Sequence, residues 1–343
     1  MMRGIVSTFR ASGSVSQAIQ LALVATPLVI ALLTSDNALL DSLNQMLIWA
    51  ALALSWNILG GYARQISVGH VAFYGIGAYT STLLALNFGI SPWLGMLAGG
   101  ALAALIGALL GSATLRLRGP FFTMATIAFA EVVRILAVNW RSVTRGAEGL
   151  AIDSTPNLPG FVFGQARSYV LVTWGLMAVL FAVSKYLDHS KTGLRLRAVR
   201  DNEDAARALG IHTFSLRISV LAVSAFFTAI CGTFYAQYLL LIDPDSVLGV
   251  DASLQMALMA VVGGIGSAIG PVLGTYLLVP FGQVLRAQLG SQLAGLHLVI
   301  YGLGLVLVLY KLPNGIWPAI EAALKRRGRA SRQRSGLPEE DAR

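Results

Sequence analysis

The chain has 343 residues, of which 56% are hydrophobic and only 12% are charged. Soluble domains carry about 25% charged residues, so a soluble globule of this length could not cover its surface with so few charges. The apolar content also excludes a disordered chain, and the 36 glycines lack the three-residue period of collagen. A polytopic membrane protein is the class that remains.

Ten runs of mainly apolar residues approach the length of about 20 residues that a bilayer span needs. In chain order these runs are Ala18–Thr34, Leu39–Leu59, Ile66–Leu86, Pro92–Ala113, Pro120–Asn139, Ser168–Leu187, Ile218–Ile242, Val250–Ile269, Gly270–Arg286 and Gly295–Leu312. The first and ninth runs are short, and the eighth and ninth almost touch. We therefore predict an all-α, polytopic membrane helical bundle of eight to ten transmembrane helices with broken or re-entrant segments.

The charged residues predict how this bundle is oriented. With ten spans and the N-terminus inside, 20 of the 25 Lys and Arg residues fall in cytoplasmic segments, in agreement with the positive-inside rule. The predicted parts are a cytoplasmic N-terminus (1–17), a transmembrane domain (18–312) with a cytoplasmic loop (188–217), and a basic cytoplasmic tail (313–343). The tail is rich in Arg, Ser and Gly, which predicts disorder.

The net charge of +9 does not predict nucleic-acid binding. The basic excess lies in loops and a tail beside the membrane, where anionic lipid headgroups are the ordinary partner. No nucleic-acid-binding fold or aromatic platform accompanies these charges. The expected partners of the basic residues are therefore membrane lipids.

A glycine-rich stretch, residues 60–79, is too polar for a lipid-facing helix and too apolar for a surface loop. Ser67, His70 and Tyr74 recur at i, i+3 and i+7, which places them on one helical face. That face could line a substrate path. The alternative is that the three side chains hydrogen-bond to neighbouring helices, and for His70 taken alone this alternative is favoured.

Glu131 and Arg134 are the only acid and base deep in a predicted span. They are three residues apart, so they share a helix face and can pair. Charges inside a membrane are costly and indicate a functional site by default, here a substrate path. The alternative, a pair that fixes helix packing, is favoured somewhat. No other Asp or Glu lies deep inside a predicted span, which argues against a proton-driven transporter.

The cytoplasmic loop between the sixth and seventh runs predicts a short helix. Asp201, Asn202, Glu203 and Asp204 supply a cap and an acidic first turn, Arg207 suits the last turn and Gly210 the stop. Two i,i+4 pairs are expected, Arg200–Asp204 and Glu203–Arg207. The other side, formed by Ala205, Ala206, Ala208 and Leu209, is small enough to enter a groove of a partner. A solvated loop helix is the alternative.

A second glycine-rich stretch predicts a helix break at membrane depth. Small residues and a proline follow one another as Gly263, Gly264, Gly266, Gly270, Pro271 and Gly274. Proline ends one helix and starts another, and glycines let helix backbones approach closely. Non-helical backbone at such depth is tolerated only against protein or a water-filled cavity. A tight loop between two ordinary helices is an equal alternative.

Four of these segments together resemble one family. Residues 195–211 resemble the coupling segment of the branched-chain amino-acid ABC importer permeases, and residues 65–79, 129–134 and 263–271 are similar to the LivM-like branch of that family. The resemblance covers roughly residues 40–312 in the right order. One departure is Arg64, where the family leads us to expect a small residue, and this leaves the packing of the local loop open.

The resemblance implies a permease subunit of the bacterial inner membrane that pairs with a second, homologous permease subunit. Two cytoplasmic ATP-binding subunits and a periplasmic or other extracytoplasmic solute-binding protein would complete the importer. The implied ATPase-coupling residues are Arg200, Asn202, Glu203, Asp204, Ala205, Ala206, Leu209 and Gly210. ATP and Mg would bind the partner, and the residues themselves agree, because the chain has no Gly-Lys dipeptide and hence no phosphate-binding loop. No enzyme activity, cofactor or metal is expected on this chain.

The substrate follows from the resemblance and not from the chemistry of the spans. Branched-chain or other hydrophobic amino acids are expected, but urea and short-amide permeases share the same segments, and ribose-type sugar permeases are more distant relatives. An ion-coupled secondary transporter is a different class, which would require acids near the midplane. A membrane-embedded enzyme would require a clustered nucleophile or metal set, and the sequence has neither.

Overall fold

The computed structural model describes residues 2–117, 119–152, 155, 159–289 and 295–324. Long helices dominate this part of the chain. Their bounds are α1 Met2–Leu33, α2 Asn37–Gly60, α3 His70–Phe88, α4 Pro92–Thr114, α5 Pro120–Asn139, α7 Ala166–His189, α10 Thr213–Leu239, α12 Val250–Gly263, α13 Gly270–Leu289 and α14 Leu296–Lys311.

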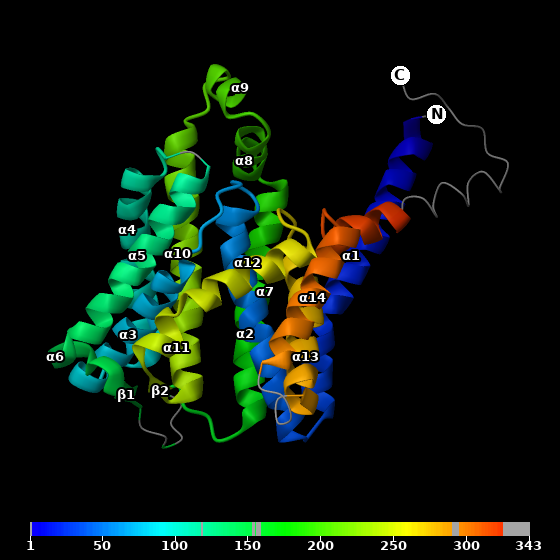
Figure 1. The fold of residues 1–343 in the computed structure, drawn as a ribbon. Coiled ribbons are helices and arrows are strands. Elements are labelled where there is room, and N and C mark those ends of the chain that lie inside the picture. Colours follow the sequence, from blue (N-terminus) through cyan, green and yellow to red (C-terminus); the bar gives the residue numbers. More distant parts are fainter. Residues whose placement is uncertain (1, 118, 153–154, 156–158, 290–294, 325–343) are drawn as a thin grey trace.

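Short elements connect the long helices. They are α6 Arg141–Thr144, a 3₁₀ turn η1 at Gly146–Glu148, α8 Lys191–Asp201, α9 Glu203–Ala208 and α11 Pro244–Leu248. Two antiparallel strands, β1 Leu150–Ala151 and β2 Leu241–Ile242, place Leu150 opposite Ile242. Figure 1 shows α8 and α9 at one end of the bundle, where α1 also begins, and β1, β2, α6 and α11 at the opposite end.

Nine helices of the described residues are long and apolar enough to cross a membrane. This number falls within the predicted range and confirms a polytopic helical membrane protein. The ninth predicted run, now α13, is not among the nine, since Pro280, Gln283 and Arg286 make it more polar. In Figure 1 it nevertheless runs beside α14 through the same layer of the bundle.

Several predicted boundaries shift, and three of them matter for the site. The third run begins at His70 instead of Ile66, and the eighth ends at Gly263, where Gly264 takes a positive φ of 121°. Residues 316–324, assigned to the tail, are helical, and Trp317 is buried. Ordered structure therefore continues past 312, while residues 325–343 of the predicted tail lie outside the described residues.

Close backbone approach holds the centre of the bundle together. α10 packs against α2, α3 and α4. At its crossing with α3, a Cβ on Gly77 would overlap the Ala229 carbonyl, and one on Gly232 would overlap the Tyr74 carbonyl. Because lipid supplies no hydrophobic drive for helix association, such small-residue contacts are a main source of packing energy in a membrane.

This packing generates a first prediction. Gly77→Ala forces α3 away from α10, and overpacking of this kind costs about 1–3 kcal/mol. Gly175→Ala is the matched control, because a Cβ at Gly175 on α7 meets nothing within 4 Å. We expect the thermal midpoint of the detergent-solubilised protein to fall for Gly77→Ala and to stay level or rise slightly for Gly175→Ala. Equal midpoints would contradict the close α3–α10 contact.

Candidate functional site

The predicted loop helix forms, as α9, and is joined to α8 at Asn202. The Asn202 backbone is extended (φ −155°, ψ 107°), and its side-chain oxygen accepts a 3.0 Å hydrogen bond from the Ala205 N–H. Gly210 follows α9 with φ +80°, and its N–H donates to the Arg207 carbonyl. The N-cap and the glycine stop read from the sequence are thus confirmed.

Glu203 ties α9 to the start of α10. Its carboxylate pairs with Arg207 through one oxygen and accepts a 2.9 Å hydrogen bond from Arg217 Nη2 through the other. Burial raises the pKa of the Glu203 carboxyl, but Arg217 and Arg207 outweigh it, so the net pKa lies below the ordinary value. The carboxylate therefore stays charged and holds α9 in place.

One of the two predicted ion pairs is wrong. The Glu203–Arg207 pair forms, whereas Arg200 Nε contacts Asp201 Oδ1 at 3.2 Å instead of reaching Asp204. The reason is that the helix is interrupted at Asn202, so Arg200 lies on α8 and Asp204 on α9. The i,i+4 relation of a continuous helix is therefore lost.

The outer side of α9 carries apolar residues that no other described part of the chain covers. Ala205, Ala208 and Leu209 are exposed, Leu209 to 80%, together with the acidic Asp204. Ala206, predicted on this side, is buried and faces the chain itself. Figure 1 shows α9 as the outermost element at its end of the bundle, which is the position expected of a surface that a partner covers.

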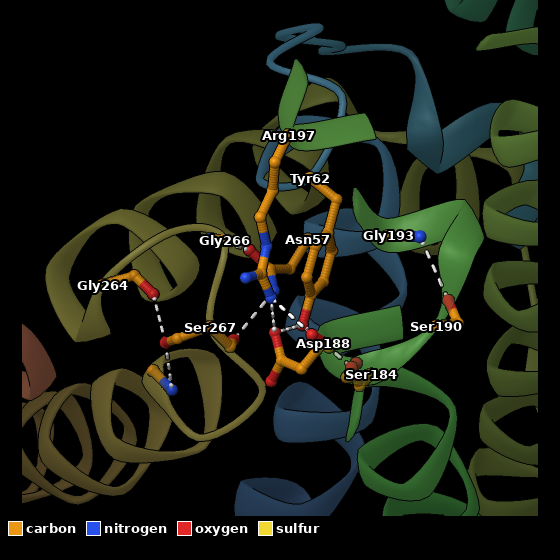
Figure 2. A network of polar contacts seen from close by, with 11 residues as sticks. Asn57, Tyr62, Ser184, Asp188, Ser190, Gly193, Arg197, Gly264, Gly266 and Ser267 are labelled. Atoms are coloured by element: carbon orange, nitrogen blue, oxygen red, sulfur yellow. Dashed lines mark hydrogen bonds and ion pairs between the residues drawn. The ribbon is translucent and has the colours of Figure 1, made fainter. Parts of the chain in front are cut away.

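Below α8, a polar network joins the turn after α2 to the end of α7 and to α8 (Figure 2). Arg197 Nη2 on α8 donates to the Asp188 carbonyl (2.7 Å) and lies 3.3 Å from its carboxylate Oδ1. The Tyr62 hydroxyl lies 3.1 Å from both Asp188 Oδ1 and the Ser184 carbonyl. Burial, and then the Asp188 charge, raise the pKa of Tyr62 well above its ordinary value, so the hydroxyl stays a donor.

The predicted helix break closes into a tight turn beside this network. Asn57, near the end of α2, donates from Nδ2 to the Ser267 carbonyl (3.0 Å) and accepts from the Gly266 N–H (2.9 Å). The Ser267 hydroxyl donates to the Gly264 carbonyl (2.9 Å) and accepts from the Gly270 N–H (3.1 Å). The stretch forms a tight turn between α12 and α13, next to α8, and its depth in the membrane stays a prediction.

The remaining residues of this stretch pack α12 against α13. A Cβ on Gly263 would overlap the Gly270 carbonyl, and one on Gly274 would overlap the Met259 carbonyl. Pro271 is buried in the first turn of α13. The two helices therefore touch backbone to backbone, as the small residues predict.

The conformation of Arg64 shows why the family leads us to expect a small residue at this position. Its φ is +53°, a left-handed conformation that favours glycine, and its side chain is exposed. The side chain points away from the core, so the packing of the loop is not disturbed.

Ser67, His70 and Tyr74 lie in the interior, and they do not form one helical face. Ser67 precedes α3, and its hydroxyl lies 2.9 Å from His70 Nδ1. His70 Nε2 lies 2.8 Å from the Ser224 hydroxyl, which itself donates to the Ser55 carbonyl. Ser224 must therefore accept from Nε2–H, and Ser67 donates to Nδ1. Hydrogen bonding to neighbouring elements, the alternative favoured for His70, describes this histidine.

Tyr74 is buried four residues further along α3. Its ring centroid lies 5.6 Å from that of Tyr235 on α10. It thus contributes to the α3–α10 contact.

Glu131 and Arg134 pair as predicted, but on the outer side of α5. Arg134 contacts both carboxylate oxygens of Glu131, at 2.7 and 3.1 Å, and its Nη1 lies 3.0 Å from Asp245 Oδ1 of α11. The Arg134 and Glu131 side chains are 31% and 41% exposed. Charges at a helix surface within a span cannot face lipid tails cheaply, so this side of α5 requires a polar or protein environment.

Sequence reasoning missed Asn57, Tyr62, Asp188 and Arg197. Asn57 is one of several polar residues in the mainly apolar run Leu39–Leu59, which is a signal that could have pointed to it. Tyr62 carries no local signal, because its partner Asp188 is 126 positions away, and Asp188 and Arg197, nine positions apart, do not have the i,i+3 or i,i+4 spacing of a helical pair. Among the described residues, no group of three His, Cys, Asp or Glu side chains is placed to hold a metal ion.

Comparison with known proteins agrees with this architecture. The family described as branched-chain amino acid transport system, permease component, matches residues 38–309. The high-affinity branched-chain amino acid transport system permease protein LivM of Escherichia coli K12 is 28% identical over 333 residues, which cover 90% of this chain and 76% of LivM. LivH of the same strain is 26% identical over 284 residues, 78% of this chain and 90% of LivH. The nucleoside ABC transporter permease NupC of Lactococcus lactis is 27% identical over 278 residues, 76% and 86% of the two chains.

The Glu203 contacts generate a second prediction. Glu203→Gln leaves Arg217, whose side chain is only 12% exposed, without its ionic partner. Hydrogen bonds to charged groups contribute about 1.5–3 kcal/mol, so hydrogen exchange of residues 203–211 should speed up about ten- to a hundredfold. Asp204→Asn changes the same charge at an exposed neighbour and should leave exchange unchanged.

The same contacts fix the pH response of α9. A carboxylate whose folded pKa is depressed stabilises the folded state above its unfolded pKa, and that stability is lost as pH falls through the folded pKa. The protection factors of residues 203–211 in the wild type should therefore stay high from neutral pH down to the ordinary carboxylate pKa and fall below it. Loss of protection already near neutral pH would contradict the Glu203 anchor.

Proposed function

Because the chain belongs to the family of branched-chain amino acid transport system permease components, we propose that it is one membrane subunit of an ATP-driven importer for hydrophobic amino acids. It forms half of the translocation path with a second permease. Two ATP-binding subunits and an extracytoplasmic solute-binding protein complete the assembly in a bacterial inner membrane.

The exposed helix α9 is the observation that supports coupling of this chain to an ATPase. A capped helix, held by two arginines on Glu203, presents exposed Ala205, Ala208 and Leu209 at the tip of the bundle. A rigid helix with an uncovered apolar side fits a groove on a partner protein. Asn202, Glu203 and Gly210 give α9 its shape, and Asp204, Ala205 and Leu209 contact the ATPase. ATP and Mg bind that ATPase, not this chain.

The charges support the orientation. α8 and α9 hold Lys191, Arg195, Arg197, Arg200 and Arg207, and basic loops stay on the cytoplasmic side. α1 begins at this same end (Figure 1). The N-terminus, α9 and the residues that follow α14 are therefore cytoplasmic, and β1, β2 and α11 face outward, toward the solute-binding protein.

The proposed second permease is a homologue of this chain. LivM and LivH of Escherichia coli carry the name of the same transport system, and this chain is similar to both. The half-exposed pair on α5 supports placing that helix against the second permease and the translocation path, because Glu131 and Arg134 need a polar or protein neighbour within the membrane.

The substrate is proposed to be a branched-chain amino acid. The LivM relatives are named for such transport, and NupC for nucleosides. The fold therefore serves more than one solute class, so the substrate is to be established by uptake. Radiolabelled leucine, isoleucine and valine are the first probes.

Leu209 provides the test of ATPase coupling. Leu209→Asp removes an apolar contact worth about 1.5–3 kcal/mol, which corresponds to ten- to a hundredfold weaker binding. The tagged protein is purified in mild detergent, and bound subunits are identified by mass. We expect ATP-binding subunits with the wild type and with Leu241→Asp, a matched control at the opposite end of the bundle where Leu241 is 51% exposed. Leu209→Asp should lose them. A wild-type protein that purifies alone and still moves leucine into liposomes would reject the proposal.

The α5 pair has its own test. Glu131→Gln with Arg134→Gln removes both charges of the pair, and Asp245, which loses its contact with Arg134, is 82% exposed and stays solvated. If the pair only fixed packing, its neutral replacement would be close to harmless. On the translocation path, we expect uptake to fall at least fivefold while ATP-binding subunits still co-purify. Wild-type uptake by the double variant would remove α5 from the path.

A further inference from the structure

The corner that connects α7 to α8 is short and hydrogen-bonded on both sides. One residue, Ser190, separates the two helices; its hydroxyl accepts from the Gly193 N–H (3.0 Å), and its own N–H donates to the Tyr186 carbonyl. A Cβ on Gly193 would overlap the Leu187 carbonyl. α8 is thus fastened to the end of α7 by hydrogen bonds on both sides of the corner.

Arg197 and Tyr62 strengthen this corner from two directions. Figure 2 shows both side chains converging on Asp188. Arg197 comes from α8, and Tyr62 from the turn that follows α2. Tyr62 is fully buried, and Asp188 is only 19% exposed. The Arg197 side chain is 38% exposed, so the pair is only half-buried. The three side chains are linked because the Asp188 carboxylate is the acceptor that Tyr62 and Arg197 share.

The turn that holds Tyr62 is bound to the turn between α12 and α13. The Asn57 carbonyl accepts from the N–H groups of Gly61 and Tyr62, while the Asn57 side chain holds the backbone of Gly266 and Ser267. A side-chain amide that donates and accepts at once fixes the relative position of both turns.

α8 also touches the second turn directly. A Cβ on Gly266 would lie 3.1 Å from Arg200 Nη1 and from the Gly61 carbonyl. The segment after α14 packs on the same turn, since Pro318 and Gly315 lie against Gly264. The 264–267 turn is therefore the point where α2, α8, α12, α13 and the C-terminal segment meet.

We propose that Tyr62, Asp188 and Arg197 are positioning residues that couple α8 and α9 to the 264–267 turn, so that ATP-driven movement of α9 reaches α2, α12 and α13 together. This inference rests on the proposed contact between α9 and an ATPase. It adds the path by which that contact acts on the membrane helices.

The first experiment compares transport with ATP hydrolysis in the purified, reconstituted complex, with leucine as the probe. Arg197→Gln and Tyr62→Phe should each lower uptake at least tenfold and ATP hydrolysis less than threefold, with the ATP-binding subunits still present. Arg197→Lys, which keeps one charged donor, should recover part of the uptake. Arg195→Gln is the matched control, since Arg195 is an exposed arginine on the same helix.

Two further results decide between coupling and mere support of the fold. Residues that act as one unit give non-additive losses. The uptake rate of the double variant, Tyr62→Phe with Arg197→Gln, should therefore equal that of the single variant with the lower uptake rate. Additive losses, or uptake and hydrolysis falling by the same factor, would overturn the proposal.

Spin labels supply a measurement independent of the solute. Labels at Leu194→Cys on α8 and Ile265→Cys in the turn are both exposed, whereas the natural Cys231 is buried. The distance between labels should stay constant on ATP binding in the parent complex and change or broaden in Arg197→Gln. A distance that changes equally in both would show that α8 and the turn move separately. A wild-type chain that binds no ATPase would contradict the proposed function. That result differs from both spin-label outcomes, which require a bound ATPase.

Discussion

Turns that are buried between helices leave backbone N–H and C=O groups that must find partners inside the protein, and this constraint ties the helices of the bundle together. The turn between α2 and α3 is satisfied from other helices, for instance by Ser253 of α12, whose hydroxyl accepts from the Val71 N–H at 2.8 Å. The turn between α12 and α13 is satisfied by Asn57 of α2. The polar residues inside these apolar helices are thus placed where the breaks need them, and the breaks in turn bind the helices to one another.

This arrangement explains which parts could be predicted. Spans, caps and the i,i+3 pair of Glu131 and Arg134 depend on residues a few positions apart, and the structure agrees with these predictions. The expected Arg200–Asp204 pair failed because the prediction assumed one continuous helix across Asn202. Ser67 was misplaced for the same kind of reason, since α3 begins only at His70.

Contacts between distant residues were beyond prediction. Asn57 and Ser267 are 210 positions apart, and His70 and Ser224 are 154 apart. A single sequence contains the polarity of these residues but not their pairing, because pairing depends on how whole helices cross. The exposure of the α5 pair is likewise a property of the packed bundle, since α5 is covered by other helices on only one side.

The one-residue corner at Ser190 has a mechanical consequence. α8 has 11 residues, which gives a rigid arm of about 16 Å at 1.5 Å per residue. A displacement at the α9 tip therefore returns to the end of α7 as a rotation about the corner, not as a sliding of α7 along its axis. Such an arm works as a lever, and a shift of about 3 Å at its tip turns it through roughly 10°. A tilt of that kind would act at the ends of α7 and α2 and, through the Glu203–Arg217 pair, at the start of α10.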